Sequence, residues 1–143
     1  MHKLNPFKEK YWDFYMNIAL LAATQSVAEK QKVGAVIVTP EGMLSTGWNG
    51  TPPGIDNTCE EGGETLPHVI HAEANAIYKM LKTGVPTQGS VLFTTHSPCM
   101  ECAKLIYSSG IMRIIYAKQH TNIAGLVFLA RHNTNISMYG EHL

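Results

Sequence analysis

Two cysteines separated by two residues, Cys99 and Cys102, follow Pro98 in the segment SPCMEC. A C-x-x-C pair can be half of a structural zinc site, a redox dithiol or part of a catalytic metal site. Pro98 is typical of the first position of a helix, where its missing N–H group would be unpaired in any case. The partial positive charge at a helix start stabilises thiolates, so the two sulfurs could bind one cation together.

A second pair of chemically capable residues, His71 and Glu73, begins the segment HAEANAI. One C-x-x-C supplies only two metal ligands, and His71 could be the third. Three protein ligands leave the fourth tetrahedral position to water, which is typical of catalytic rather than structural zinc. Glu73 need not bind the metal, because it could hydrogen-bond that water and move its proton.

Each half of this pattern has a plainer interpretation when it is taken alone. HAE is a common tripeptide on solvated helix surfaces, and Cys99 and Cys102 could be a redox pair as in thioredoxin-like proteins. The combination of H-x-E with a later P-C-x-x-C is the signature of zinc-dependent base deaminases. The sequence therefore favours a catalytic zinc site with His71, Cys99 and Cys102 as ligands and Glu73 as the acid–base residue.

Alternating helical and strand-like segments must position these residues. Apolar spacings of three and four predict a helix over 7–28, with Tyr11, Phe14, Tyr15, Ile18, Leu21 and Ala22 facing inward. Further helices are predicted over 71–82, with Ala72, Ala76, Ile77 and Met80 inward, over 99–109 and over 122–132. Short β-branched runs predict strands over 32–39, 43–48, 90–95, 112–117 and 135–140. This order predicts one α/β domain over residues 1–143, with a mixed five-stranded sheet and helices on both faces.

Composition and charge exclude several classes of function. Lys plus Arg and Asp plus Glu are both 11, and only Arg113 and Arg131 are arginines. A chain that grips a nucleic acid polymer usually carries a basic excess, so a small-molecule substrate is favoured. The longest apolar runs are too short to span a membrane, and the charged N-terminal segment is unlike a signal peptide. Three cysteines do not form a disulfide framework, and we expect a reducing, cytoplasmic location.

Four segments, KVGAVIV, GWNGTPPG, HAEANAI and HSPCMECAKLIYSSGI, resemble in order the deoxycytidylate (dCMP) deaminase family of the zinc-dependent cytidine deaminase superfamily. The resemblance runs from about Gln25 to Tyr116. It implies a three-layer cytidine-deaminase-like fold and hydrolytic deamination of dCMP to dUMP and ammonia. In that reaction Glu73 would take a proton from the zinc-activated water, protonate N3 of the ring and later protonate the leaving amine.

The resemblance also suggests residues that bind the substrate. It implies that Asn49 holds the sugar and that backbone groups around Ala72 and Ser97 read the base edge. Asn49 has the alternative of a turn-forming Asn in an Asn-Gly pair. Ser26 lies near the 5′-phosphate region of the family, but Gln25 stands where the family often has arginine, which leaves the phosphate contacts open.

Regulation is a further implication of the resemblance, because many members are hexamers that dCTP activates and dTTP inhibits. The effector segment of the family corresponds to Gly47, Trp48 and Gly50 here, and Mg²⁺ would accompany a triphosphate. Trp48 could stack on a nucleotide or could be a core residue at a strand end. Arg113 could reach a phosphate across a subunit boundary or could simply lie exposed on its strand.

The third cysteine, Cys59, lies in a long irregular segment over 49–70, where ordered loops are often functional. Some relatives of the family carry a second, structural zinc near such a loop, and His68 could be a second ligand. Two ligands are too few for a tetrahedral site, and a spare loop cysteine is the commoner outcome.

Two alternative interpretations stay open at this point. The same chemistry could act on dCTP as well, or on another cytosine or adenine substrate such as a free nucleoside or a tRNA adenosine. The other alternative is a non-catalytic zinc-binding module, which predicts a fourth protein ligand and no role for Glu73.

Overall fold

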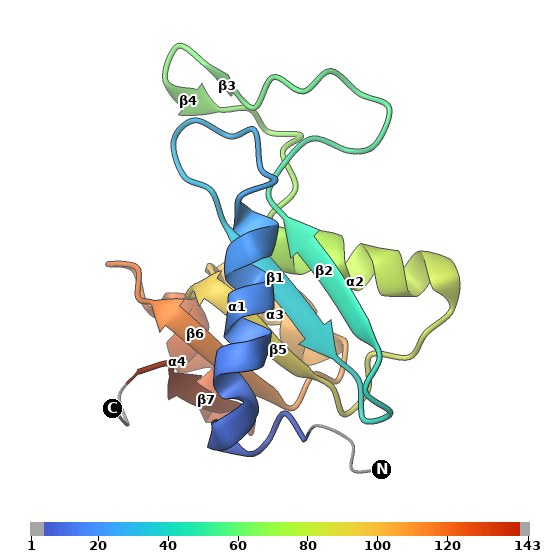
Figure 1. Ribbon diagram of the computed structural model, residues 1–143. Coiled ribbons are helices and arrows are strands. Elements are labelled where there is room, and N and C mark those ends of the chain that lie inside the picture. Colours follow the sequence, from blue (N-terminus) through green and yellow to red (C-terminus); the bar gives the residue numbers. More distant parts are fainter. Residues whose placement is uncertain (1–4, 141–143) are drawn as a thin grey trace.

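The computed structural model describes residues 5–140, and its centre is a five-stranded sheet with the strand order β2-β1-β5-β6-β7 (Figure 1). The strands are β1 (Gly34–Val38), β2 (Leu44–Trp48), β5 (Val91–His96), β6 (Arg113–Lys118) and β7 (Asn135–Met138). Strand β1 runs antiparallel to β2 and β5, whereas β5, β6 and β7 are parallel. The mixed five-stranded sheet predicted from the sequence is confirmed.

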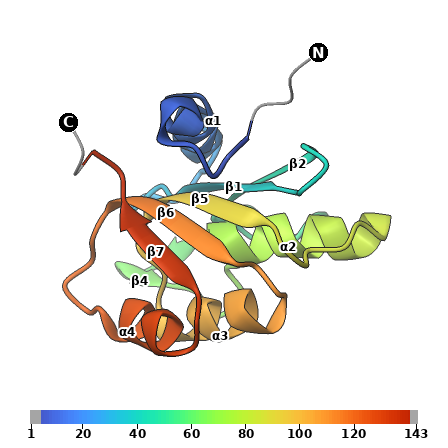
Figure 2. The same cartoon turned by 90° about the horizontal axis from the view of Figure 1, so that it is seen from below.

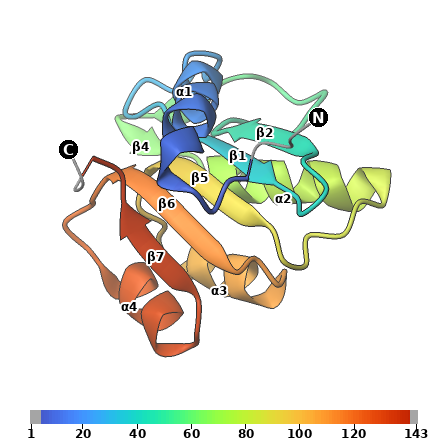
Figure 3. The ribbon, with the colours of Figure 1, turned by 60° about the horizontal axis from the view of Figure 1, so that its bottom comes forward.

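Helices cover both faces of this sheet, as predicted. Figure 2 shows α1 (Trp12–Ala23) alone on one face, and α2 (Ala72–Thr83), α3 (Met100–Ser108) and α4 (Ala124–Arg131) on the other. A single 3-10 turn, η1 (Glu9–Tyr11), leads into α1. A parallel pair of strands needs a crossover connection, and here α3 joins β5 to β6 and α4 joins β6 to β7. The two helices lie side by side (Figure 3). Within residues 5–140, no helix has the length and apolar character needed to cross a membrane.

Two hydrophobic clusters fill the space on the two sides of the sheet. Alternate residues of each strand point to opposite faces, so Ala35 and Ile37 of β1 join the α2 and α3 side, while Val36 and Val38 join the α1 side. All five residues of β1 are buried. This continuous burial is expected of a central strand that has helices above and below it.

Of the six residues expected to face inward, Tyr15 and Ala22 are buried and Tyr11 and Ile18 pack against the core. The prediction was wrong for Phe14 and Leu21, and for the helix length. Phe14 and Leu21 were expected inside but are 49% and 66% exposed, whereas Met16 and Ala19 are fully buried. A Cβ atom on Gly34 of β1 would lie only 2.0 Å from the carbonyl oxygen of Ala19. Because α1 approaches β1 this closely, a small residue, Ala19, lies at the point of contact. Regular α-helix covers Trp12–Ala23 rather than 7–28.

The segment predicted to be irregular contains a short hairpin, β3 (Glu60–Glu61) and β4 (Glu64–Thr65). The segment is closed at its base by an antiparallel bridge between Gly50 and Ile70. The Glu60 carboxylate accepts backbone N–H groups of Glu29 (3.1 Å) and Lys30 (3.3 Å). These bonds tie the hairpin to the loop that follows α1, so two long connections lie together at the end of the sheet shown at the top of Figure 1.

Candidate metal and catalytic site

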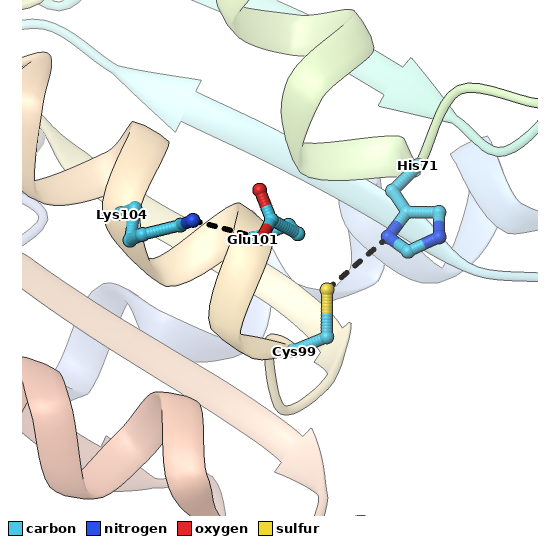
Figure 4. A network of polar contacts seen from close by, with 4 residues as sticks. All are labelled: His71, Cys99, Glu101 and Lys104. Carbon is cyan, nitrogen blue, oxygen red and sulfur yellow. Dashed lines mark hydrogen bonds and ion pairs between the residues drawn. The ribbon is translucent and has the colours of Figure 1, made fainter.

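The starts of α2 and α3 bring the predicted metal ligands together. His71 and Cys99 immediately precede the two helices and have extended backbone conformations, with φ of −70° and −72°. Cys102 lies in the first turn of α3. His71 Nδ1 lies 3.3 Å from Cys102 Sγ and 3.5 Å from Cys99 Sγ, and Figure 4 shows the second of these contacts. The three candidate ligand atoms all lie within 4.8 Å of one another.

The spacing of these atoms fits a zinc ion. Zinc–nitrogen and zinc–sulfur bonds of roughly 2.1 and 2.3 Å, meeting at a tetrahedral angle, place nitrogen and sulfur about 3.6 Å apart. Both measured nitrogen–sulfur distances are close to this value. The part of the chain that the structure describes contains no other group of three His, Cys, Asp or Glu side chains with this proximity.

The protonation states of the cluster also favour a cation. Hydrogen bonds with Cys102 and then with His71 lower the pKa of the Cys99 thiol to about 3. The hydrogen bond with Cys99 raises the pKa of Cys102, and burial raises it further. One proton is therefore retained at the buried sulfur. A bound divalent ion would replace that proton and hold both sulfurs as thiolates.

Glu73 is a buried carboxyl group beside this cluster, with only 4% of the residue exposed. It lies in the first turn of α2, two residues after His71. Burial is the main cause that raises the pKa of Glu73. A carboxyl group whose pKa is shifted toward neutrality can both accept and return a proton under ordinary conditions, which suits a general acid–base residue.

A cavity of about 260 Å³ opens over the cluster and is lined by side chains from both halves of the chain. Its lining consists of Ala28, Lys30, Gln31, Val33, Asn49, Glu60, Thr65, Val69, His71, Ala72, Glu73, His96, Ser97, Cys99 and His120. The predicted substrate positions Asn49, Ala72 and Ser97 are therefore brought together with the cluster, whereas Ser26 does not line the cavity.

Ser26 and Asn49 are both engaged with the backbone. Asn49 Oδ1 accepts the N–H of Val33 (2.8 Å), and its Nδ2 donates to the carbonyl of Gln31 (2.7 Å). Ser26 is 3% exposed, and its hydroxyl donates to the carbonyl of Asn49 (2.7 Å). These bonds brace the cavity wall formed by residues 31–33. Binding of sugar by Asn49 and of phosphate by Ser26 stays a prediction.

Sequence reasoning missed two histidines of the cavity wall, His96 and His120. Their rings stack with centroids 5.4 Å apart and planes at 25°. The Ser97 hydroxyl accepts the N–H of His120 (2.9 Å), and the Ser97 N–H donates to the carbonyl of Lys118 (2.8 Å). His96 stands three residues before Cys99 and could have been noticed there. His120 reaches the site only because β6 lies beside β5, which no local pattern indicates.

The four residues considered for effector binding lie outside the cavity lining. A Cβ atom on Gly47 would lie 2.3 Å from the carbonyl oxygen of Ala72, so this glycine allows β2 to pack against α2. Trp48 is half-buried under the ammonium group of Lys79, which lies 4.7 Å from its ring centre. Gly50 pairs with Ile70 at the base of the loop segment.

Arg113 lies at the opposite end of β6 from the cavity. Its guanidinium carbon is 5.0 Å from the ring centre of Trp12, and Nη2 donates to Ser137 Oγ (3.0 Å). The arginine is therefore neither exposed nor directed at the site within one chain. Its contact with an effector across a subunit boundary stays a prediction, as do the effector roles of the GWNG residues.

The second zinc site considered from the sequence at Cys59 and His68 stays a prediction. Cys59 is 3% exposed, and its thiol lies 3.5 Å from the carbonyl oxygen of Asn57. Burial, followed by the charge of Glu60, raises the pKa of this thiol and so favours its neutral form. Over residues 5–140, these two residues belong to no group of three potential ligands.

The fold and site together define a class of protein. A mixed sheet whose covering helices present a His/Cys/Cys group, with a buried glutamate two residues after the histidine, is the arrangement of the zinc-dependent base deaminases. A sequence profile of the cytidine and deoxycytidylate deaminase zinc-binding region matches residues 10–118. The chain belongs to the cytidine and deoxycytidylate deaminase family.

Individual relatives agree with this assignment. The deoxycytidylate deaminase of Mycobacterium phage D29 is 36% identical over 124 residues, which cover 76% of this chain and 95% of the phage protein. ComE operon protein 2 of Bacillus subtilis is 36% identical over 111 residues, which cover 75% of this chain but only 59% of that protein. The dCMP deaminase of cyanophage S-TIM5, solved in complex with dCMP and dUMP, superposes with a TM-score of 0.88 at 37% identity, covering 92% of this chain and 98% of the phage chain.

Proposed function

We propose that this chain hydrolyses dCMP to dUMP and ammonia, using a zinc ion held by His71, Cys99 and Cys102. The observation that carries the proposal is that these three side chains lie together beside the buried Glu73, at a cavity that His71, Glu73 and Cys99 line. At about 260 Å³, the cavity lies near the lower end of the usual size of ligand pockets. The likeness to the dCMP-bound phage enzyme supports dCMP as the substrate.

A bound zinc ion would supply an acidified water molecule near neutral pH. The residues of the chain perform the proton transfers. Glu73 accepts the proton that the water loses and delivers it to N3 of the cytosine ring. The water oxygen forms a bond to C4. Glu73 then takes the second proton of that oxygen and delivers it to the amine, and the C4–N4 bond breaks as the C4 carbonyl forms. Water and dCMP are thus converted into dUMP and ammonia without any other reactant.

The burial of Glu73 suits this double role. Its raised pKa brings the carboxyl group closer to the pH at which it can change protonation state in both directions. The closed environment also strengthens its hydrogen bonds to the reacting atoms, because no bulk water competes for them. Glu73→Gln keeps the size and burial of the side chain but cannot accept a proton.

The direct test measures ammonia release from dCMP, dCTP, deoxycytidine and cytidine by the zinc-loaded protein. We expect dCMP to be the preferred substrate and Glu73→Gln to lose at least roughly 100-fold in kcat while retaining zinc. Glu101→Gln is the matched control, since Glu101 is exposed on α3 and pairs with Lys104 at 2.8 Å (Figure 4). Full activity in Glu73→Gln would contradict the proposal, and zinc without any deamination would favour a structural zinc-binding module.

The same experiment separates the alternatives in substrate. Equal turnover of dCMP and dCTP would indicate a broader nucleotide deaminase, and preference for a free nucleoside would reassign the substrate. Adding dCTP, dTTP and Mg²⁺ to the dCMP assay tests the predicted regulation, and light scattering tests the predicted hexamer. The cytoplasmic location stays a prediction.

A further inference from the structure

The stacked rings of His96 and His120 form a wall of the cavity that the deamination chemistry does not use. His96 ends β5 and His120 follows β6, so both lie at the same edge of the sheet as the metal cluster. Their parallel arrangement brings two imidazoles to one side of the cavity, 5.4 Å apart. Imidazoles can donate hydrogen bonds and carry positive charge, which makes this wall chemically different from the rest of the lining.

Hydrogen bonds hold the pair in place and leave donors for a ligand. Thr95 Oγ1 accepts the N–H of Gly34 (3.1 Å) and lies 2.8 Å from His96 Nδ1. Because Nδ1 is taken by Thr95, Nε2 is the nitrogen of His96 that remains to bind a ligand. When the hydroxyl donates to Nδ1 of a neutral imidazole, or accepts from Nδ1–H of a protonated one, Nε2 carries a proton and can donate to a ligand. The backbone of His120 is fixed through its N–H bond to Ser97 Oγ (2.9 Å).

The charges around the cavity favour an anion on this wall. Neither arginine of the chain lines the cavity, which leaves Lys30 and the histidines as its basic side chains. Glu60, whose carboxylate accepts the backbone N–H of Lys30 (3.3 Å), lines the cavity together with Lys30, so the formal charges of these two side chains cancel. The imidazole wall contains no carboxylate from β5 or from the loop after β6, and Lys118 is paired with His96 across the two strands.

The surroundings of His96 are already short of negative charge. Burial lowers the pKa of His96 first, and the neighbouring His120 and Lys118 lower it further. Three basic groups therefore oppose one another at this point. A phosphate group placed beside them would offset the repulsion and accept their N–H donors, since hydrogen bonds to a charged acceptor are the stronger ones.

We propose that His96 and His120 bind the 5′-phosphate of the substrate and so make the site selective for a nucleotide over a nucleoside. This inference rests on the proposed function, because it assumes that the base lies at the metal cluster. It assigns to two imidazoles the part that an arginine would otherwise play, in a chain whose arginines, Arg113 and Arg131, lie outside the cavity lining.

The test compares dCMP with deoxycytidine in the zinc-loaded protein and in His96→Gln, His120→Gln and the double variant. Loss of two charge-assisted hydrogen bonds should reduce kcat/KM for dCMP by roughly 10- to 100-fold, mainly through KM, with less than about 3-fold change for deoxycytidine. Binding of dUMP and deoxyuridine, measured by calorimetry, gives the same comparison if turnover of the nucleoside is too slow to measure. His132→Gln, a histidine of the α4 end outside the cavity lining, is the matched control.

The outcomes separate this inference from the proposed function. Turnover of dCMP by the unaltered protein, with equal losses for nucleotide and nucleoside in the variants, would overturn the phosphate assignment and leave the function standing. A selective loss for dCMP in Lys30→Gln, but not in the histidine variants, would place the phosphate on the other wall and also overturn it. Absence of dCMP turnover by the unaltered protein would contradict the proposed function itself. The phosphate site would still be supported in that case if dUMP bound more tightly than deoxyuridine and the difference depended on both histidines. Thermal unfolding of each variant confirms that it is folded.

Discussion

Replacing Gly47 with alanine should damage the active site from a distance. Gly47 lies on β2 and touches no part of the cavity, but an added Cβ would lie 2.3 Å from the carbonyl oxygen of Ala72 and 2.6 Å from the amide nitrogen of Ala76. Both atoms belong to the backbone of α2, which cannot swing aside as a flexible side chain can. The helix that carries Glu73, and that begins directly after His71, must therefore shift.

The size of the effect follows from these distances. Ordinary contacts begin near 3.4 Å, so α2 must move away from β2 by roughly 1 Å. Overpacking of this kind costs about 1–3 kcal/mol. For a chain of this length, that corresponds to a fall in Tm of roughly 3–10 °C. A 1 Å displacement of catalytic groups can reduce turnover by about 100-fold, so activity should fall far more than stability.

The assay measures Tm, zinc content and kcat/KM on dCMP for Gly47→Ala and for Gly50→Ala. Gly50 belongs to the same GWNG segment, but its added Cβ would meet no atom within 4 Å, and its backbone does not need positive φ. We expect Gly50→Ala to behave as the unaltered protein. Unchanged Tm and activity in Gly47→Ala, or equal damage in Gly50→Ala, would refute the argument that close packing explains this glycine.

Three further predictions concern the metal, α1 and pH. The protein should bind one zinc per chain by elemental analysis, Cys59→Ser should keep it and Cys99→Ser should lose it; two zincs in the unaltered protein would instead support the second site at Cys59. Met16→Ala, at a fully buried position, should cost about 2–5 kcal/mol in urea unfolding, whereas Leu21→Ser on the exposed face should change stability by less than about 0.5 kcal/mol. The hydrogen bond from the Tyr139 hydroxyl to an aspartate of α1 raises the Tyr139 pKa, so its stabilisation is present below pH 10 and is lost as pH rises through the raised value. The difference in urea midpoint between the protein and Tyr139→Phe should therefore shrink between pH 7 and pH 11, and a constant difference would contradict this.

The sheet and the metal cluster could be predicted because their signals are local. Strand runs with β-branched residues define the five strands, and the ligands stand at helix starts that Pro98 and the following apolar periodicity indicate. The inward residues of α1 were predicted only in part, because Phe14 and Leu21 are exposed. The apolar residues of this helix cover more than one face, and the choice among them depends on the tertiary contact of Ala19 with Gly34, a glycine on the following strand.

Local sequence patterns also could not predict that His120 and Glu60 line the cavity. His120 and Glu60 approach the metal cluster only after the order of the strands and the path of the long loop are known. Asn49 and Ser26 show the converse difficulty. Their positions near the site were anticipated, yet their side chains are bonded to backbone of the loops that shape the cavity.

These bonds suggest how chemistry and selectivity are divided in this molecule. The reacting groups lie at the starts of α2 and α3, which pack into the core. Gly47 allows α2 to pack closely on β2, and the first turns of both helices fix the spacing of the reacting side chains. The remaining walls come from connections between elements, where Asn49 and Glu60 fasten one loop to the next. Loops can change residue by residue without disturbing a buried cluster. Substrate preference should therefore follow the loop residues and the imidazole wall, while the deamination step itself should follow the helix starts.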